Sequence, residues 1–211
     1  MEVSRTSLVV LAAGLLGGCH ASAPRQWKSS LIVNNAEALA GAQAAPTIEA
    51  RFGGVVRDAD AEHRIEFVGR RLTRGLPDPG YTYQYRLLDS DKINALSLPG
   101  GRVYITRGLY ARLSSDDLLA AVLAHEVAHL ASRDHFKPAP SDAGQALKKE
   151  LSADAYAFRI LGDADLRRTA LIDLVLLIED ALPAGWAEAR AANLTEQLHD
   201  ADNIDPSIGM K

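Results

Sequence analysis

Apolar positions recur every three to four residues along much of this chain, and in one stretch they alternate. Residues 58–71 carry Ile65 and Val68 at helical spacing, which predicts an amphipathic helix. Further helices are predicted over 117–131, 141–161, 165–182 and 187–198. Residues 81–87 alternate and predict a strand, and residues 103–106 have strand composition after a Pro-Gly-Gly turn. A helix, a small antiparallel sheet and then more helices predict an α+β domain.

The apolar helix over 117–131 contains the sequence His125-Glu126-Val127-Ala128-His129. Residues four apart share one face of a helix, so both imidazoles can reach one metal ion. Glu126 lies about 100° around the helix, beside the ion rather than on it. Since Zn²⁺ lowers the pKa of a bound water to about 7, Glu126 is expected to act as general base. The motif therefore indicates metal-assisted hydrolysis, most often of a peptide bond.

Two residues compete as the third ligand. His135 completes the spacing H-E-x-x-H-x-x-S-x-x-H, which is the metzincin spacing with Ser132 in place of glycine. Glu150 lies on the predicted helix 141–161, four residues before Asp154 and on the same face. Given the first motif, Glu150 is the better candidate, and Asp154 can fix the tautomer of a ligand imidazole. The two acids could instead form a solvated pair, and that alternative stays open.

Three segments in this order resemble the gluzincin zinc metallopeptidases of the CAAX prenyl protease and HtpX type, including their soluble periplasmic relatives. Residues 94–101 are similar to the family's N-A-x-x-x-P-G-G segment, and His125 to His129 form its H-E-x-x-H motif. Residues 150–154 are similar to its E-x-x-A-D segment. Three ordered motifs are more specific than any one of them.

The resemblance implies a zincin-like fold and one Zn²⁺ per chain. The implied ligands are His125, His129 and Glu150, with Glu126 as the general base and Asp154 supporting a ligand imidazole. It also implies that a strand at the sheet edge lies along the cleft and pairs with an extended protein or peptide substrate. That strand contains Asn94, Ala95, Leu96 and Ser97. An ordinary hairpin without a substrate role stays open as the alternative.

The chain also departs from the family after the glutamate helix. Many relatives carry a His-Pro segment there, from which a His or Arg is expected to stabilise the oxyanion. The tail from Ala184 onward contains no His-Pro, and His199 is a doubtful substitute because it reads as an exposed helix-end residue. The sequence therefore leaves the oxyanion-stabilising residue unassigned.

The N-terminus has the pattern of a secreted lipoprotein. Residues 1–18 read as a signal peptide, and Leu16-Gly17-Gly18-Cys19 resembles a lipobox with Cys19 as the lipidated residue. Residues 19–50 are expected to form a tether, with a short ordered piece at 31–33 at most, and residues 51–211 the metallopeptidase domain. Because His20 rather than aspartate follows Cys19, the expected location is the periplasmic side of the outer membrane. An inner-membrane anchor and a soluble periplasmic form are the alternatives.

Composition narrows the function further. The 211 residues are 47% hydrophobic, enough for one domain with a sizeable core. A net charge of −4 without a basic cluster argues against nucleic acid binding. The sequence thus predicts a zinc endopeptidase in quality control of misfolded envelope proteins. An envelope chaperone or assembly lipoprotein with a structural or rarely used zinc site is the alternative, and a metal-free binding module is a third. The oligomeric state stays open.

Overall fold

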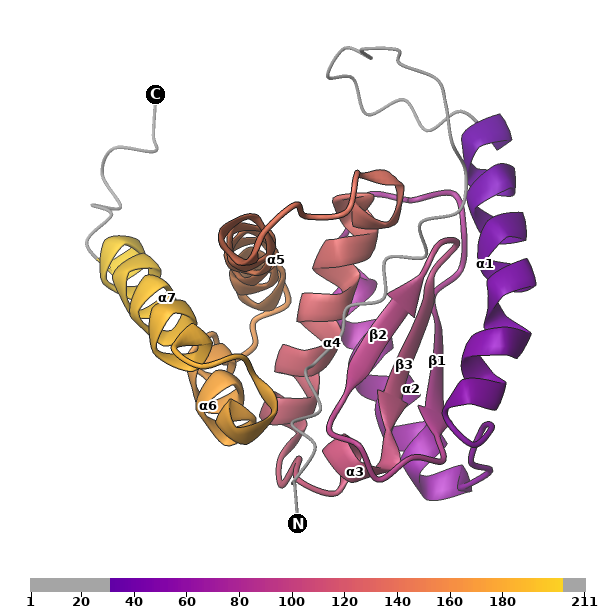
Figure 1. The fold of residues 1–211 in the computed structure, drawn as a ribbon, viewed down its shortest axis with the longest axis horizontal. Helices are drawn as coiled ribbons and strands as arrows, with labels where there is room; N and C mark the ends of the chain where they lie inside the picture. The colour runs from indigo at the N-terminus through magenta and orange to yellow at the C-terminus, as the bar shows by residue number, and fades with distance from the viewer. Residues whose placement is uncertain (1–30, 203–211) are drawn as a thin grey trace.

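The computed structural model describes residues 31–202, which form an α+β domain as the sequence pattern predicts (Figure 1). None of the described helices has the length and hydropathy that a membrane span requires. In chain order the helices and strands are α1 (Leu31–Arg51), α2 (Ala59–Thr73), β1 (Gln84–Leu88), β2 (Ala95–Leu98), β3 (Arg102–Thr106), α3 (Arg107–Tyr110), α4 (Asp116–Ala131), α5 (Ala143–Asp163), α6 (Ala170–Leu177) and α7 (Trp186–Asp202). Two 3₁₀ turns complete the described part, η1 (Asp134–Phe136) and η2 (Glu179–Ala181).

The sheet is mixed, so the prediction of an antiparallel sheet is wrong in this detail. Its strand order is β1-β3-β2. The Pro-Gly-Gly turn makes β2 and β3 an antiparallel hairpin, as predicted, with Leu96 opposite Tyr104. The hairpin inserts β3 between β2 and β1, so β1 pairs in parallel with β3, and Tyr85 lies opposite Val103. This order leaves β2 at the edge of the sheet.

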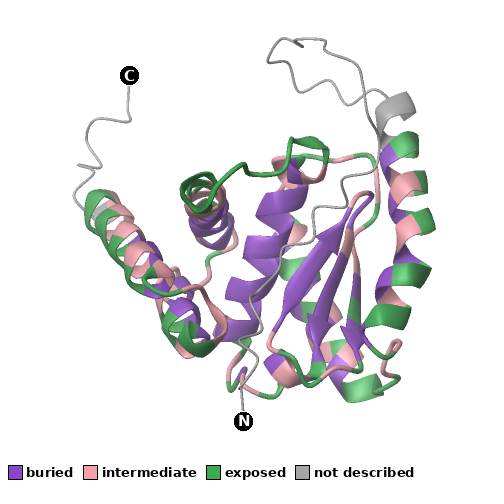
Figure 2. Ribbon diagram, viewed as in Figure 1, coloured by how far each residue is buried: buried purple, intermediate pink, exposed green. Residues whose placement is uncertain are grey.

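Helices cover both faces of this sheet. Helices α2 and α4 pack on one face, where Ile65, Leu87, Ile105 and Leu123 belong to the main core. Helix α4 is buried from Leu118 to Leu130, and it is purple along nearly its whole length in Figure 2. Helices α5, α6 and α7 pack beyond α4, on the side away from the sheet (Figure 1). Helix α4 is therefore the central element, with neighbours on two sides.

Helix α1 replaces most of the predicted tether. Its residues Ala45 and Ile48, with Phe52 directly after its end, pack against the other sheet face in a second hydrophobic cluster with Leu98 and Tyr104. The segment is rich in alanine, which has the highest helix propensity, and its apolar residues at i, i+3 and i+7 form one stripe. Only the N-terminal part of the predicted tether, together with the signal segment and Cys19, lies outside the described residues.

The remaining helices lie close to their predicted ranges, and α6 differs most, since it covers Ala170–Leu177 rather than 165–182. Ser115 caps α4 by accepting a hydrogen bond from the backbone N–H of Leu118. Helix α6 begins at Ala170 rather than 165, because Asp165 has a left-handed backbone (φ 53°) in the turn that ends α5. The residues that precede α6 therefore form a connection rather than a first helical turn.

Helix α1 crosses the turn between β2 and β3 at very short range. A Cβ atom added to Gly41 would collide with the carbonyl oxygen of Pro99. Backbone atoms at such a crossing cannot move aside as a flexible side chain can. The absence of a side chain at Gly41 therefore allows α1 to pack closely against the hairpin.

We expect Gly41→Ala to lower the free energy of unfolding by about 1–3 kcal/mol, because overpacking outweighs the better helix propensity of alanine. Urea unfolding of the purified protein measures this change. Gly75→Ala is the control, since nothing lies within 4 Å of the added Cβ atom. Equal stability of the two variants would show that α1 does not pack against the hairpin in this way.

Candidate metal centre

Helices α4 and α5 bring His125, His129 and Glu150 into one buried cluster. The Nε2 atoms of the two imidazoles are 3.2 Å apart. Glu150 places Oε2 3.1 Å from His125 Nε2 and Oε1 3.8 Å from His129 Nε2. One potential ligand atom from each of the three residues lies within 4.8 Å of the others. The three residues are 6%, 1% and 4% exposed, so water screens them poorly.

A carboxylate near Nδ1 fixes the orientation of each imidazole, whose Nε2 atom lies at the cluster. His125 Nδ1 lies 2.9 Å from Asp154 Oδ1, and His129 Nδ1 lies 2.7 Å from Asp134 Oδ2. A carboxylate only accepts hydrogen bonds, so both Nδ1 atoms carry the proton. In the neutral imidazoles, both Nε2 lone pairs then point at each other and at Glu150. This is the arrangement of metal-binding histidines with carboxylate support.

The chemistry of these donors fits a divalent cation. Burial disfavours charged imidazoles, but hydrogen bonds to Asp134 and Glu150 raise the pKa of His129 to about 10. Burial likewise raises the pKa of Glu150, but hydrogen bonds from both histidines hold it well below its ordinary range. The cluster therefore favours positive charge between its members. Two imidazole nitrogens and one carboxylate are also the donor set of catalytic zinc sites, which keep one position open.

Asp134 is a site residue that sequence reasoning missed. It follows α4 at the start of η1, where Arg133 has a left-handed backbone (φ 52°) that turns the chain back toward His129. Burial raises the pKa of Asp134, but hydrogen bonds from His129 and Lys137 lower it to about 2. The spacing His129 to Asp134 is not a helical one, so no periodic pattern marks this contact.

Arg190 is a second residue that sequence reasoning missed. From α7 its guanidinium forms two hydrogen bonds with Asp154, from Nη2 to Oδ1 (2.6 Å) and from Nε to Oδ2 (2.7 Å). Its Nη1 atom lies 3.9 Å from Glu150 Oε2, and the residue is only 2% exposed. Burial raises the pKa of Asp154, but the charge of Arg190 and the hydrogen bond from His125 keep it below its ordinary value. Arg190 thus stabilises the charged form of the carboxylate that orients His125.

Glu126 is placed beside the cluster by the helical turn of α4. It is 5% exposed, and no described side chain forms a hydrogen bond or ion pair with its carboxylate. Its charge contributes to the raised pKa of His129, which places it within electrostatic range. The carboxylate is therefore free to exchange a proton with a small molecule at the cluster.

The predicted edge strand packs against α4 from the side of the sheet. Asn94, which is 7% exposed, precedes it, and its Oδ1 atom has no described hydrogen-bond partner. The structure does not bring His135 to the cluster: its Nε2 atom lies 2.7 Å from the carbonyl oxygen of Ser97 in β2. Burial lowers the pKa of His135 to about 4, so the ring is neutral near pH 7. The metzincin-type ligand set is therefore not the one that the fold assembles.

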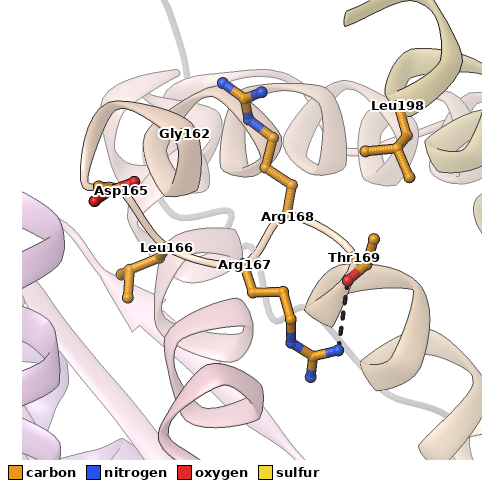
Figure 3. Close-up of a pocket in the computed structure, with 7 residues that line it drawn as sticks. All are labelled: Gly162, Asp165, Leu166, Arg167, Arg168, Thr169 and Leu198. Carbon is orange, nitrogen blue, oxygen red and sulfur yellow. Dashed lines mark hydrogen bonds between the residues drawn. The ribbon is translucent and has the colours of Figure 1, made fainter. Parts of the chain in front are cut away.

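His199 lies exposed near the end of α7, more than two turns beyond Arg190. A pocket elsewhere is lined by residues between the end of α5 and the start of α6, together with Leu198 of α7 (Figure 3). There Arg167 donates a hydrogen bond to Thr169, which Figure 3 shows as a dashed line. The lining includes no member of the metal cluster, so this pocket is a separate feature.

Comparison with known proteins agrees with this geometry. The model of peptidase family M48 matches residues 59–147, which run from α2 into the first turn of α5. The match contains both histidines and Glu126 and ends three residues before Glu150.

Curated relatives match about a third of the chain. The chain is 32% identical over 69 residues to the beta-barrel assembly-enhancing protease of Yersinia pestis, covering 33% of this chain and 14% of the relative. It is 36% identical over 70 residues to the mitochondrial metalloendopeptidase OMA1 of Schizosaccharomyces pombe, covering 32% and 21%. The beta-barrel assembly-enhancing protease of Escherichia coli K12 is 28% identical over 79 residues, covering 37% and 16%. The matched segments thus span only about a fifth or less of these relatives. Together with the family match and the His-His-Glu cluster, these similarities support a metallopeptidase domain of the M48 type over the matched residues.

Proposed function

We propose that this protein is a zinc-dependent endopeptidase of the bacterial cell envelope that degrades misfolded envelope proteins. The observation that carries the proposal is the buried cluster of His125, His129 and Glu150, with Glu126 beside it and without a hydrogen-bond partner among the described residues. Structural zinc sites usually close with four protein ligands. Three converging donors with a free carboxylate next to them match a catalytic site instead.

The three donors would hold Zn²⁺, one ion per chain. When bound, the ion supplies Lewis acidity, which acidifies water and polarises a carbonyl group. Glu126 accepts a proton from the attacking water on a carboxylate oxygen. It then donates this proton to the leaving amine nitrogen, so that one residue serves as base and acid in turn.

The surrounding charged residues keep the imidazoles in position. Asp154 and Asp134 hold the proton on Nδ1 of the two histidines, which leaves both Nε2 atoms available as ligands. Arg190 fixes Asp154 through two hydrogen bonds and balances its charge. We assign these three residues a positioning role.

An extended substrate fits the free edge of β2. Main-chain hydrogen bonds to an edge strand select for extended conformation, with little dependence on sequence. Unfolded segments can adopt this conformation, whereas folded domains cannot present it. This supports misfolded proteins as the substrate class, and two of the relatives above are named as enhancing beta-barrel assembly.

The same names support an envelope location, and we propose that lipid on Cys19 anchors the protein to the periplasmic side of the outer membrane. Cys19 lies outside the described residues. The observation that supports the anchor is the lipobox-like sequence that ends in this cysteine. Inner-membrane anchoring and a soluble periplasmic form are the alternatives.

A second candidate function is an envelope chaperone or assembly factor whose zinc site is structural or rarely used. The absence of a His-Pro segment favours it, as does the engagement of Arg190 by Asp154, which keeps this cation from acting freely on an oxyanion. The two functions differ in whether Glu126 is needed.

We expect Glu126→Gln to retain zinc and lose most proteolysis, about 10²- to 10⁴-fold, because the amide cannot take up the proton. Cleavage of β-casein by the zinc-loaded protein measures the loss, and metal analysis verifies the zinc content. Glu62→Gln, at a half-buried position of α2, is the control. Undiminished cleavage would exclude Glu126 as the base, and zinc binding without cleavage by the wild type would favour the chaperone.

We expect Asp134→Asn and Asp154→Asn each to weaken zinc binding about 10- to 100-fold, because the ligand imidazoles lose their anionic support. Competition with a fluorescent zinc chelator measures this affinity. Asp163→Asn, at the exposed end of α5, is the matched control. Affinity equal to the wild type in both variants would contradict the positioning role.

A further inference from the structure

The register of β2 against β3 determines which residues of β2 turn their main-chain N–H and C=O groups away from the sheet. Thr106 N donates to the carbonyl oxygen of Asn94 at 3.0 Å, and Asn94 N donates to Thr106 Oγ1 at 3.1 Å, so these two residues are a hydrogen-bonded pair across the hairpin. Hydrogen-bonded and non-hydrogen-bonded pairs alternate in an antiparallel ladder. Leu96 and Leu98 therefore turn their main-chain groups toward β3, and Ala95 and Ser97 turn theirs outward. No described strand pairs with this outward side.

One of these outward acceptors is already occupied. His135 Nε2 lies 2.7 Å from the carbonyl oxygen of Ser97 and 3.4 Å from its Oγ atom. A carbonyl oxygen only accepts, so His135 donates from Nε2. The segment 133–138, which we call the strap, thus crosses the edge strand at Ser97.

The strap is held at its start and exposed to solvent beyond His135, where Lys137 pairs with Asp134 of the same segment. Its start is fixed by Asp134, which bonds His129, and by an ion pair between Arg133 and Glu37 of α1 (3.0 Å). Residues 136–142 are all exposed, and the Phe136 side chain is 55% exposed. Little buried area therefore holds the free part of the strap against the strand.

We propose that His135 competes with the substrate main chain for the carbonyl oxygen of Ser97 and thereby governs access to the edge strand. This inference rests on the proposed function, because it concerns the substrate path of that site. A substrate N–H displaces the imidazole N–H, so one hydrogen bond replaces another. Proline has no main-chain N–H and cannot make this exchange. Substrates with proline at the position that pairs with Ser97 are therefore expected to bind less well.

The expected size of the competition is modest. A neutral hydrogen bond of this kind corresponds to a factor of roughly two to ten in an equilibrium constant. Removing the His135 donor while keeping a ring of similar size therefore increases substrate affinity by about this factor. The chemical step does not involve the imidazole, so kcat is expected to stay unchanged.

The test measures binding of fluorescein-labelled β-casein, an unfolded protein, to the zinc-loaded protein in the Glu126→Gln background. Addition of His135→Phe is expected to lower Kd about two- to tenfold, whereas His135→Gln, which keeps a donor, stays close to the parent. His63→Phe on the exposed side of α2 is the control. In the active enzyme, His135→Phe is expected to lower KM and leave kcat unchanged. An equal or higher Kd for His135→Phe overturns the proposal.

A second measurement needs no substitution at His135. In ¹⁵N-labelled Glu126→Gln protein, saturation with β-casein should shift the His135 Nε2 resonance, and an unchanged resonance overturns the proposal even if His135→Phe fails to fold. The outcomes also separate this inference from the proposed function. Tighter binding by His135→Phe without any cleavage by the wild type rejects only the peptidase, and cleavage with an unaltered Kd rejects only the role of His135.

Discussion

The convergence of two imidazole nitrogens and a carboxylate inside a buried helix–helix contact is the constraint on which the rest of this structure depends. Burying charged groups without compensation costs several kcal/mol, so such a cluster persists only with partners. His125 and His129 lie on an α-helix that is otherwise apolar, and Glu150 comes from the neighbouring helix. Asp134, Asp154 and Arg190 then complete a network in which carboxylates and cations alternate. A divalent ion at the centre would supply the positive charge that this network favours.

The central helix explains why the site lies where it does. Helix α4 packs against β2 on one side and against α5 on the other. His125 and His129 on this helix therefore lie between the edge strand and the helix that carries Glu150. The edge strand then runs beside the cluster, and η1, which leaves the end of α4, connects the two through Asp134 and His135. The carboxylate that supports His129 and the imidazole that contacts the edge strand thus come from one short turn. The family match ends early in α5, whereas Arg190 comes from α7, outside the matched residues.

Sequence could predict the parts of this account that are encoded locally. The spacing of His125, Glu126 and His129 fixes their relative placement on one helix, and the same reasoning groups Glu150 with Asp154. The Pro-Gly-Gly turn likewise indicated the hairpin. Asp134 and Arg190 escaped prediction because their contacts depend on a left-handed turn and on the packing of a distant helix. Helix α1 was not predicted because its alanine-rich composition resembles that of a linker. The parallel pairing of β1 with β3 was not predicted because the spacing of apolar residues does not determine the order of strands in a sheet.

The most direct test of the central claim is X-ray absorption at the zinc edge of the purified protein, combined with metal analysis. The account predicts one zinc per chain, with nitrogen and oxygen ligands at about 2.0–2.2 Å and the scattering pattern of two imidazoles. Glu150→Gln should change the oxygen ligands and leave the two imidazoles in place. Protein without zinc after purification and reconstitution, or a spectrum without imidazole scattering, would contradict the account.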